Sequence, residues 1–124
     1  MVYITADDVK AFSKIRREDL GYTAEADFDA FINTLIGYAE SLINDYMNQS
    51  FTAETVPASV KYATVQLCSN ILHIILQRKI SPIVQTGDFT LRLVIPEAFT
   101  GELKGLLDPY RVLDVKMEEG EGEV

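Results

Sequence analysis

The stretch DFDAFINTLIGYAESLINDYMN, residues 27–48, decides the fold of this chain. Its apolar side chains recur at steps of three and four residues, and polar side chains such as Glu40 take the positions between them. This repeat is the pattern of an amphipathic α-helix that buries one face against other elements. We therefore predict a helix from Asp27 to Asn48, about 33 Å long at 1.5 Å per residue and capped by Thr23 or Asp27.

A second long helix is predicted from Ala58 to Arg78. Pro57 stands just before it, and proline is favoured at a helix start because the N–H that it lacks has no partner there. An apolar stripe runs along this stretch and widens in its second half, through Val60, Ala63, Thr64, Leu67, Cys68, Ile71, Leu72, Ile74, Ile75 and Leu76. A helix that is apolar nearly all round has to be enclosed on several sides. We expect it to be the central helix of a small bundle.

A shorter helix is predicted at the N-terminus. Thr5 and Asp8 have nearly the spacing and chemistry of a capping box, which predicts a helix from Ala6 to about Arg17. Its inner side would carry Val9, Phe12 and Ile15. The chain then turns near Gly21, because a residue without a side chain suits a left-handed turn.

The last predicted helix runs from Glu97 to about Leu107. Asp108-Pro109 ends it, because the residue before a proline avoids helical geometry. Tyr110 and Arg111 follow in a short extended tail. Both residue types are enriched at hot spots of protein interfaces, so we predict that this pair binds a partner. The alternative is a tail that folds back onto its own core.

Between Ser81 and Ile95 the pattern changes from helix to strand. Pro82 stops the preceding helix, and the cluster Thr86-Gly87-Asp88 favours a turn. After it, apolar residues occupy alternate positions, the period of a strand: Phe89, Leu91, Leu93 and Ile95. One hairpin alone is only marginally stable in water. We predict a β-hairpin or extended arm before the last helix, whose four apolar residues pack on the helices or bind another chain.

The length predicts a single domain, and the four predicted helices make it mainly α. The chain has 124 residues, enough for a single core, and we expect a helical domain over residues 1–115 and a disordered acidic tail over 116–124. The formal net charge is −8 and no basic stripe occurs. Because binding to nucleic acid relies on cations that displace counterions, we expect none here. The start MVYITADD is not a signal peptide, and no apolar run is long enough to cross a bilayer. We expect the protein to stay in the compartment where it is made.

Signatures of catalysis are missing from the sequence. Cys68 and His73 are single residues of their type, so we expect a buried core thiol and a structural histidine. Asp7 and Asp8 fit the first turn of a helix, where negative charge is favoured. The glycines do not have the spacing of a phosphate-binding loop. We predict a non-enzymatic protein without cofactor or metal; an enzyme with an unfamiliar site is the weaker alternative.

Four stretches in this order resemble the head–tail connector family of tailed phages. They are ITADDVKAF (4–12), FINTLIGYAESLINDYMNQSF (31–51), VPASVKYATVQLCSNIL (56–72) and LKGLLDPYRV (103–112). The resemblance spans Ile4 to Val112 and is weakest from Gln77 to Pro96. Residues 1–115 are thereby identified as a helical head–tail connector domain.

The resemblance implies a structural virion protein of the head–tail junction, assembled in the host cytoplasm. Members of the family form rings of about a dozen copies, which need head-to-tail contacts that close. Such a ring docks on the portal protein, extends the DNA channel and carries the stopper or tail; an isolated chain could still be a monomer. An acidic channel wall would let DNA slide past. A small helical regulator of a mobile element, similar to an antitoxin, accounts equally well for size and charge.

Overall fold

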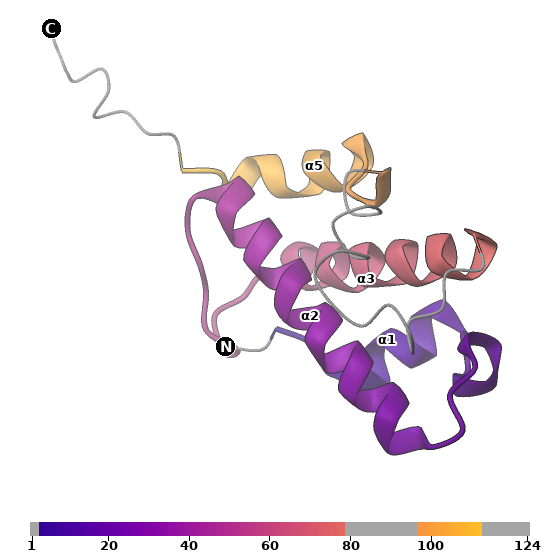
Figure 1. Cartoon of the computed structure of the whole chain (residues 1–124). Helices are drawn as coiled ribbons and strands as arrows, with labels where there is room; N and C mark the ends of the chain where they lie inside the picture. The colour runs from indigo at the N-terminus through magenta and orange to yellow at the C-terminus, as the bar shows by residue number, and fades with distance from the viewer. Residues whose placement is uncertain (1–2, 79–96, 113–124) are drawn as a thin grey trace, which may run out of the picture.

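The helix α3 (Ala58–Arg78) is the central element of the fold. The computed structural model describes residues 3–78 and 97–112. Within them, α3 contacts α1 (Ala6–Ser13), α2 (Glu25–Met47) and α5 (Gly101–Leu107). Figure 1 shows α1 and α5 on opposite sides of α3, with α2 crossing all three. The described residues form a mainly helical small bundle without strands, which confirms the predicted fold class.

The buried face of α3 explains this central position. Its predicted bounds agree with the observed ones, and most of its apolar stripe is fully enclosed: Val60, Ala63, Leu67, Cys68, Ile71, Leu72 and Ile75. Thr64 is buried among them, and its hydroxyl donates to the carbonyl of Val60 at 2.8 Å, so burial leaves the hydroxyl satisfied. The Cys68 thiol lies in this core, and burial raises its pKa to about 12. It is therefore a protonated, unreactive thiol at neutral pH.

The helix α2 begins two residues earlier than predicted. Its N-cap is Ala24, which offers no side-chain cap, so the prediction of Thr23 or Asp27 in that role was wrong. Glu25 and Asp27 lie in the first turn, where their charges favour the helix dipole. At the other end, Asn48 adopts a left-handed conformation with φ of 59°, the geometry that closes many helices.

The N-terminal helix is shorter than predicted. The capping box is present, since the Asp8 N–H donates to Thr5 Oγ1 at 3.2 Å and the Thr5 N–H to Asp8 Oδ2 at 2.9 Å. However, α1 ends at Ser13 because Lys14 turns to a left-handed φ of 64°. A short 3₁₀ helix, η1 (Arg17–Leu20), then leads to Gly21, which has the left-handed φ of 87° expected of a glycine turn.

The predicted last helix is interrupted. Glu97 and Ala98 are helical, but the chain breaks at Phe99 and α5 starts only at Gly101. The break occurs because the Thr100 hydroxyl accepts the Leu103 N–H at 3.3 Å and so caps a new helix. A 3₁₀ helix, η2 (Asp108–Tyr110), continues directly from α5.

Two predicted features lie outside the described residues. These are the hairpin at 81–95, with Phe89, Leu91, Leu93 and Ile95, and the acidic tail at 116–124. Among the described helices, none has the length and apolar character needed to span a membrane.

Gly37, in the middle of α2, gives a stabilising substitution. Apart from the adjoining residues and the backbone of α2 itself, a methyl group at this exposed position would meet no atom within 4 Å. Gly37→Ala should therefore raise the free energy of unfolding by about 0.5–1 kcal/mol, the cost of glycine inside a helix. Denaturant unfolding measures this change. Gly21→Ala is the contrasting control, because its positive φ should make alanine destabilising there; a loss of stability in Gly37→Ala would reveal a contact at that position.

Candidate interaction surface

The C-terminal segment Asp108–Val112 is fastened to the C-terminal end of α2. The N–H of Val112 donates to the carbonyl of Met47 at 2.7 Å, and the Arg111 Nε donates to the carbonyl of Tyr46 at 3.1 Å. These carbonyls belong to the last turn of α2, where a helix leaves its carbonyl groups without intrahelical partners. The segment thus completes the hydrogen bonding of the end of α2. We call it the C-terminal anchor.

Two aromatic contacts also link the anchor to the rest of the chain. The rings of Phe51 and Tyr110 meet edge to face at 6.3 Å, and the guanidinium of Arg111 lies 4.5 Å from the centre of the Tyr46 ring. The hydroxyl of Tyr46 donates to Asp108, and this bond to the carboxylate raises the pKa of the Tyr46 phenol. The anchor therefore folds back on its own chain, one of the two alternatives that the sequence allowed.

Tyr110 and Arg111 differ in their exposure to solvent. Tyr110 is half-buried in η2, not in an extended tail as predicted, whereas Arg111 and Val112 are exposed. Both residues of the predicted pair thus lie at the C-terminal end of α2, and Arg111 is the one that is exposed to solvent. Binding of a partner by the pair stays a prediction.

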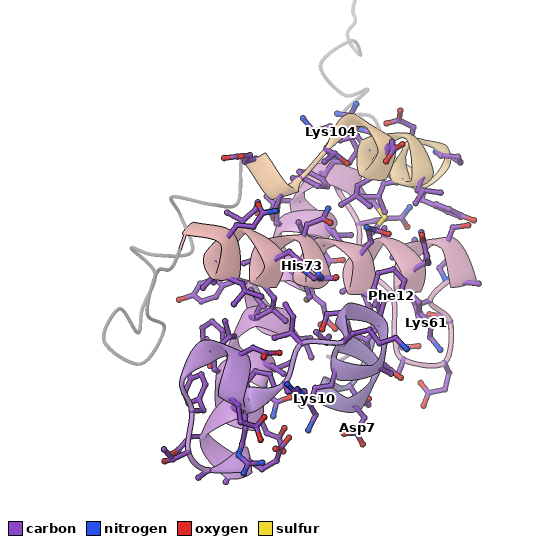
Figure 2. The ribbon with its side chains drawn as sticks, turned by 90° about the vertical axis from the view of Figure 1, so that its right-hand side faces the viewer. Asp7, Lys10, Phe12, Lys61, His73 and Lys104 are labelled. Atoms are coloured by element: carbon purple, nitrogen blue, oxygen red, sulfur yellow. The ribbon has the colours of Figure 1, made fainter. Side chains whose placement is uncertain are left out.

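A shallow groove between α1 and α3 exposes two aromatic rings. Phe12 is 41% exposed and Tyr62 49%, and their rings meet edge to face with centroids 5.8 Å apart. We call this site of about 510 Å³ the aromatic groove; it is lined by Ile4, Asp8, Ala11, Phe12, Lys61, Tyr62 and Val65. Figure 2 shows Phe12 and Lys61 where α1 approaches α3.

The sequence did not predict the aromatic groove. Phe12 was expected on the inner side of the first helix, but Val9 and Ser13, four residues apart, face the core and turn Phe12 outward. Tyr62 is not part of the buried stripe of α3; the neighbouring residues Val60 and Ala63 are buried, and Tyr62 points to another side of the helix. No signal in the sequence identified the outward ring, because the polar residue Ser13 takes the core position that the apolar pattern assigned to Phe12.

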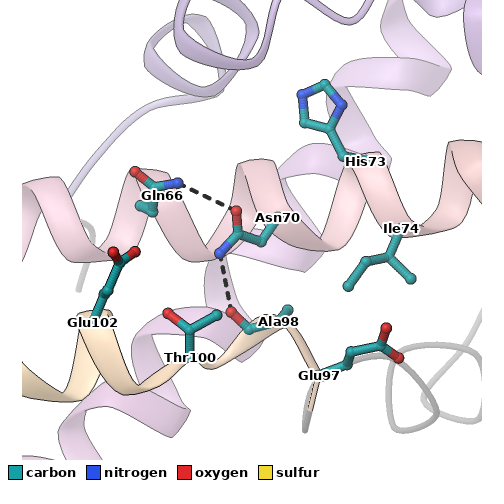
Figure 3. Close-up of a pocket in the computed structure, with 8 residues that line it drawn as sticks. All are labelled: Gln66, Asn70, His73, Ile74, Glu97, Ala98, Thr100 and Glu102. Carbon is teal, nitrogen blue, oxygen red and sulfur yellow. Dashed lines mark hydrogen bonds between the residues drawn. The ribbon is translucent and has the colours of Figure 1, made fainter.

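A polar pocket lies between α3 and the segment before α5. Figure 3 shows the amide of Gln66 donating to Asn70, and the amide of Asn70 donating to the carbonyl of Ala98 at 3.0 Å. His73 points away from α5 and is exposed to solvent. No group of three metal-binding side chains occurs in residues 3–78 and 97–112. The contacts in this pocket fasten the segment before α5 to α3.

Glu40 lies inside the bundle, although the sequence placed it on the polar face of its helix. The residue is only 5% exposed, and the backbone N–H groups of Tyr3 and Ile4 lie against its carboxylate. Its carboxylate accepts the N–H of Tyr3, whose hydroxyl in turn donates to Asn44 at 2.6 Å. Burial raises the pKa of the Glu40 carboxyl above its ordinary value, and the N–H groups of Tyr3 and Ile4 oppose this rise. Glu40 therefore fastens the N-terminal segment to α2.

The raised pKa of Glu40 predicts a pH effect on stability. The folded chain holds the Glu40 proton more tightly than the unfolded chain does, so the stability from this group is present below its unfolded pKa and is lost as pH rises through the folded pKa. The wild type, compared with Glu40→Gln, should therefore lose free energy of unfolding as the pH rises from about 4, the ordinary pKa of a glutamate carboxyl, through the raised pKa of the folded state. Denaturant unfolding over this pH range measures the difference.

Glu25→Gln is the control of opposite sign. The hydrogen bond from Lys10, at 2.8 Å, lowers the pKa of Glu25, so its contribution should be lost as pH falls. A difference between wild type and Glu40→Gln that does not change with pH would contradict the burial of a titrating carboxyl.

An ionic cluster joins α1 to the N-terminal end of α2. The ammonium of Lys10 lies 2.7 Å from Asp29 and 2.8 Å from Glu25, which raises the pKa of Lys10. Arg17 lies 3.3 Å from Glu25. Lys10 and Arg17 are thus engaged with acids of the same chain, which favours pairing within the bundle over a phosphate-binding stripe.

Comparison with known proteins identifies the family. The family model for phage gp6-like head-tail connector proteins matches residues 4–85, about two thirds of the chain. Searches of curated proteins and of solved structures gave no match. The matched range contains α1, α2 and α3 complete, and with them the aromatic groove and most of the core. The chain therefore belongs to the gp6-like family of phage head–tail connector proteins, which are structural proteins of the virion.

Proposed function

We propose that this chain is the subunit of an adaptor ring that docks beneath the portal and carries the stopper or tail. The observation that carries the proposal is the family match over α1 to α3, the three helices that form the body of the bundle. The match favours a connector over a regulator similar to an antitoxin. In this role the protein acts at the head–tail junction after assembly in the host cytoplasm, without catalysis and without reading a DNA sequence.

The surfaces of the bundle fit a ring. A closed ring uses heterologous contacts, in which one patch of each copy meets a different patch of the next. The aromatic groove offers one such patch, and the C-terminal anchor, built from a different element, offers a separate surface for the portal. The net charge of −8 fits a channel wall, because repelled phosphates slide past it.

Deletion of the gene from the phage or prophage that encodes this chain tests the proposed function. We expect heads to form but fewer than about a tenth of them to carry tails, counted by electron microscopy. Expression of the wild-type chain in trans should restore the tailed particles. Normal numbers of tailed particles in the deletion would contradict a connector role. Symmetric dimers without affinity for the portal would support the regulator.

A further inference from the structure

Tyr3 is held at both of its ends on one face of α2. Its backbone N–H donates to the carboxylate of Glu40, and its hydroxyl donates to Asn44 Oδ1 at 2.6 Å. Glu40 and Asn44 are four residues apart, so they lie one above the other on the same face of the helix. The side chain of Tyr3 therefore runs along α2, and its hydroxyl lies toward the C-terminal end of that helix.

The Tyr3 hydroxyl also binds the loop that follows α2. It accepts the N–H of Phe51 at 2.9 Å, so one oxygen atom acts as donor and acceptor at once. These bonds join three segments that are distant in sequence: the N-terminal segment, α2 and the loop 48–51. Both bonds are partly buried, and a buried N–H that loses its partner is costly. The position of Phe51 on α2 thus depends on Tyr3.

The same loop holds the C-terminal anchor. The side-chain amide of Asn48 donates to the carbonyl of Val112 at 3.1 Å. The side-chain amide of Gln49 donates to the carbonyl of Tyr110, and the ring of Phe51 meets the Tyr110 ring edge to face. Phe51 therefore binds the N-terminal segment through its backbone and the anchor through its ring.

We infer that Tyr3 is a positioning residue for the C-terminal anchor. Tyr3 fixes the loop 48–51, and the loop contacts Tyr110 and Val112, the residues on both sides of Arg111. The backbone from which the exposed guanidinium projects is thereby held in one place. A group that is already ordered loses less entropy when it binds. The inference rests on the proposed docking of the anchor to the portal and adds the residue that prepares the anchor for it.

Hydrogen exchange in Tyr3→Phe tests the positioning without any partner. The variant, made in the full chain, removes the hydroxyl and keeps the ring, so the bundle should stay folded. The N–H of Val112 donates to the carbonyl of Met47, so its exchange, followed by NMR, reports opening of the anchor. We expect this exchange to become at least tenfold faster. The exchange of Leu67, fully buried on α3, reports the stability of the whole bundle and should rise by a factor at least three times smaller.

Tyr22→Phe is the matched control. Tyr22 is also buried, and its ring packs against two phenylalanines near the N-terminal end of α2. This variant should leave the exchange of Val112 within threefold of the wild type. Equal acceleration of Val112 and Leu67 in Tyr3→Phe would reveal a general loss of stability, and unchanged exchange of Val112 would show that α2 holds the anchor alone. Either result would overturn the inference.

A double-mutant cycle with the portal tests the consequence for docking. Tyr3→Phe should weaken portal binding, measured by sedimentation, at least fivefold in the wild-type background. In the Arg111→Ala background it should weaken binding less than twofold, because the guanidinium that it positions is gone. Equal factors in the two backgrounds would contradict a role through Arg111. A chain that does not bind the portal at all would contradict the proposed function, and the exchange rates would still decide the role of Tyr3.

Discussion

Replacing Ile71 with alanine is expected to lower the free energy of unfolding by about 2–5 kcal/mol. Ile71 is fully buried on α3, the helix that contacts α1, α2 and α5. Truncation leaves a cavity whose walls are held by three neighbouring helices, so the site cannot easily collapse. Domains of this kind have a total stability of about 5–15 kcal/mol, so this one change removes a large share of it.

Gln77→Ala on the same helix is the matched control. Gln77 is exposed, so its replacement should change the free energy of unfolding by less than about 0.5 kcal/mol. Urea unfolding of both variants, followed by circular dichroism, gives the two values. Similar small losses in both variants would contradict the central place of α3 in the core.

The second large effect is expected on docking, in Arg111→Ala. If Arg111 is a hot spot for the portal, its loss should weaken binding by about 30-fold, which corresponds to roughly 2 kcal/mol. Within the chain, Arg111 contributes one hydrogen bond and one exposed cation–π contact with Tyr46. Such a contact contributes about 0.5–1 kcal/mol, so the fold should persist. Sedimentation with the portal and thermal unfolding measure the two quantities.

Arg16→Ala separates a specific contact from a general loss of charge. Arg16 is also exposed and also carries one positive charge, and it lies near η1 at the far end of α2. We expect Arg16→Ala to bind the portal within about threefold of the wild type. Unchanged binding of Arg111→Ala would show that the anchor only completes the end of α2. A collapse of its melting temperature would show that Arg111 is needed for folding.

The long helices were predictable because their signals are local. Pro57 and the apolar stripe after it gave the bounds Ala58–Arg78 as observed. The capping box of Thr5 and Asp8 gave the start of α1. In each case the residues that indicate the helix lie within the helix or directly before it.

The misplaced boundaries come from the ends of helices. Lys14 adopts a positive φ, which a lysine in the sequence does not predict, and it ends α1 four residues before the predicted end. Thr100, followed by Gly101 and Glu102, starts a new helix where a continuous one was predicted. Thr100 did carry a signal, because threonine is a preferred N-cap residue.

The features of the candidate surface depend on contacts between distant segments. Glu40 was predicted on the polar face of its helix, but it is buried and its carboxylate accepts the N–H of the distant residue Tyr3. The aromatic groove needs α1 and α3 side by side, since Phe12 and Tyr62 are fifty residues apart in sequence. The anchor likewise joins Arg111 to Tyr46. A periodic pattern along one helix carries no information about such pairs.

Cryo-electron microscopy of the purified chain mixed with the portal protein from the same genome tests the connector role most directly. We predict a ring of this bundle seated coaxially beneath the portal. Portal rings that remain bare at saturating concentrations of the chain would contradict the account.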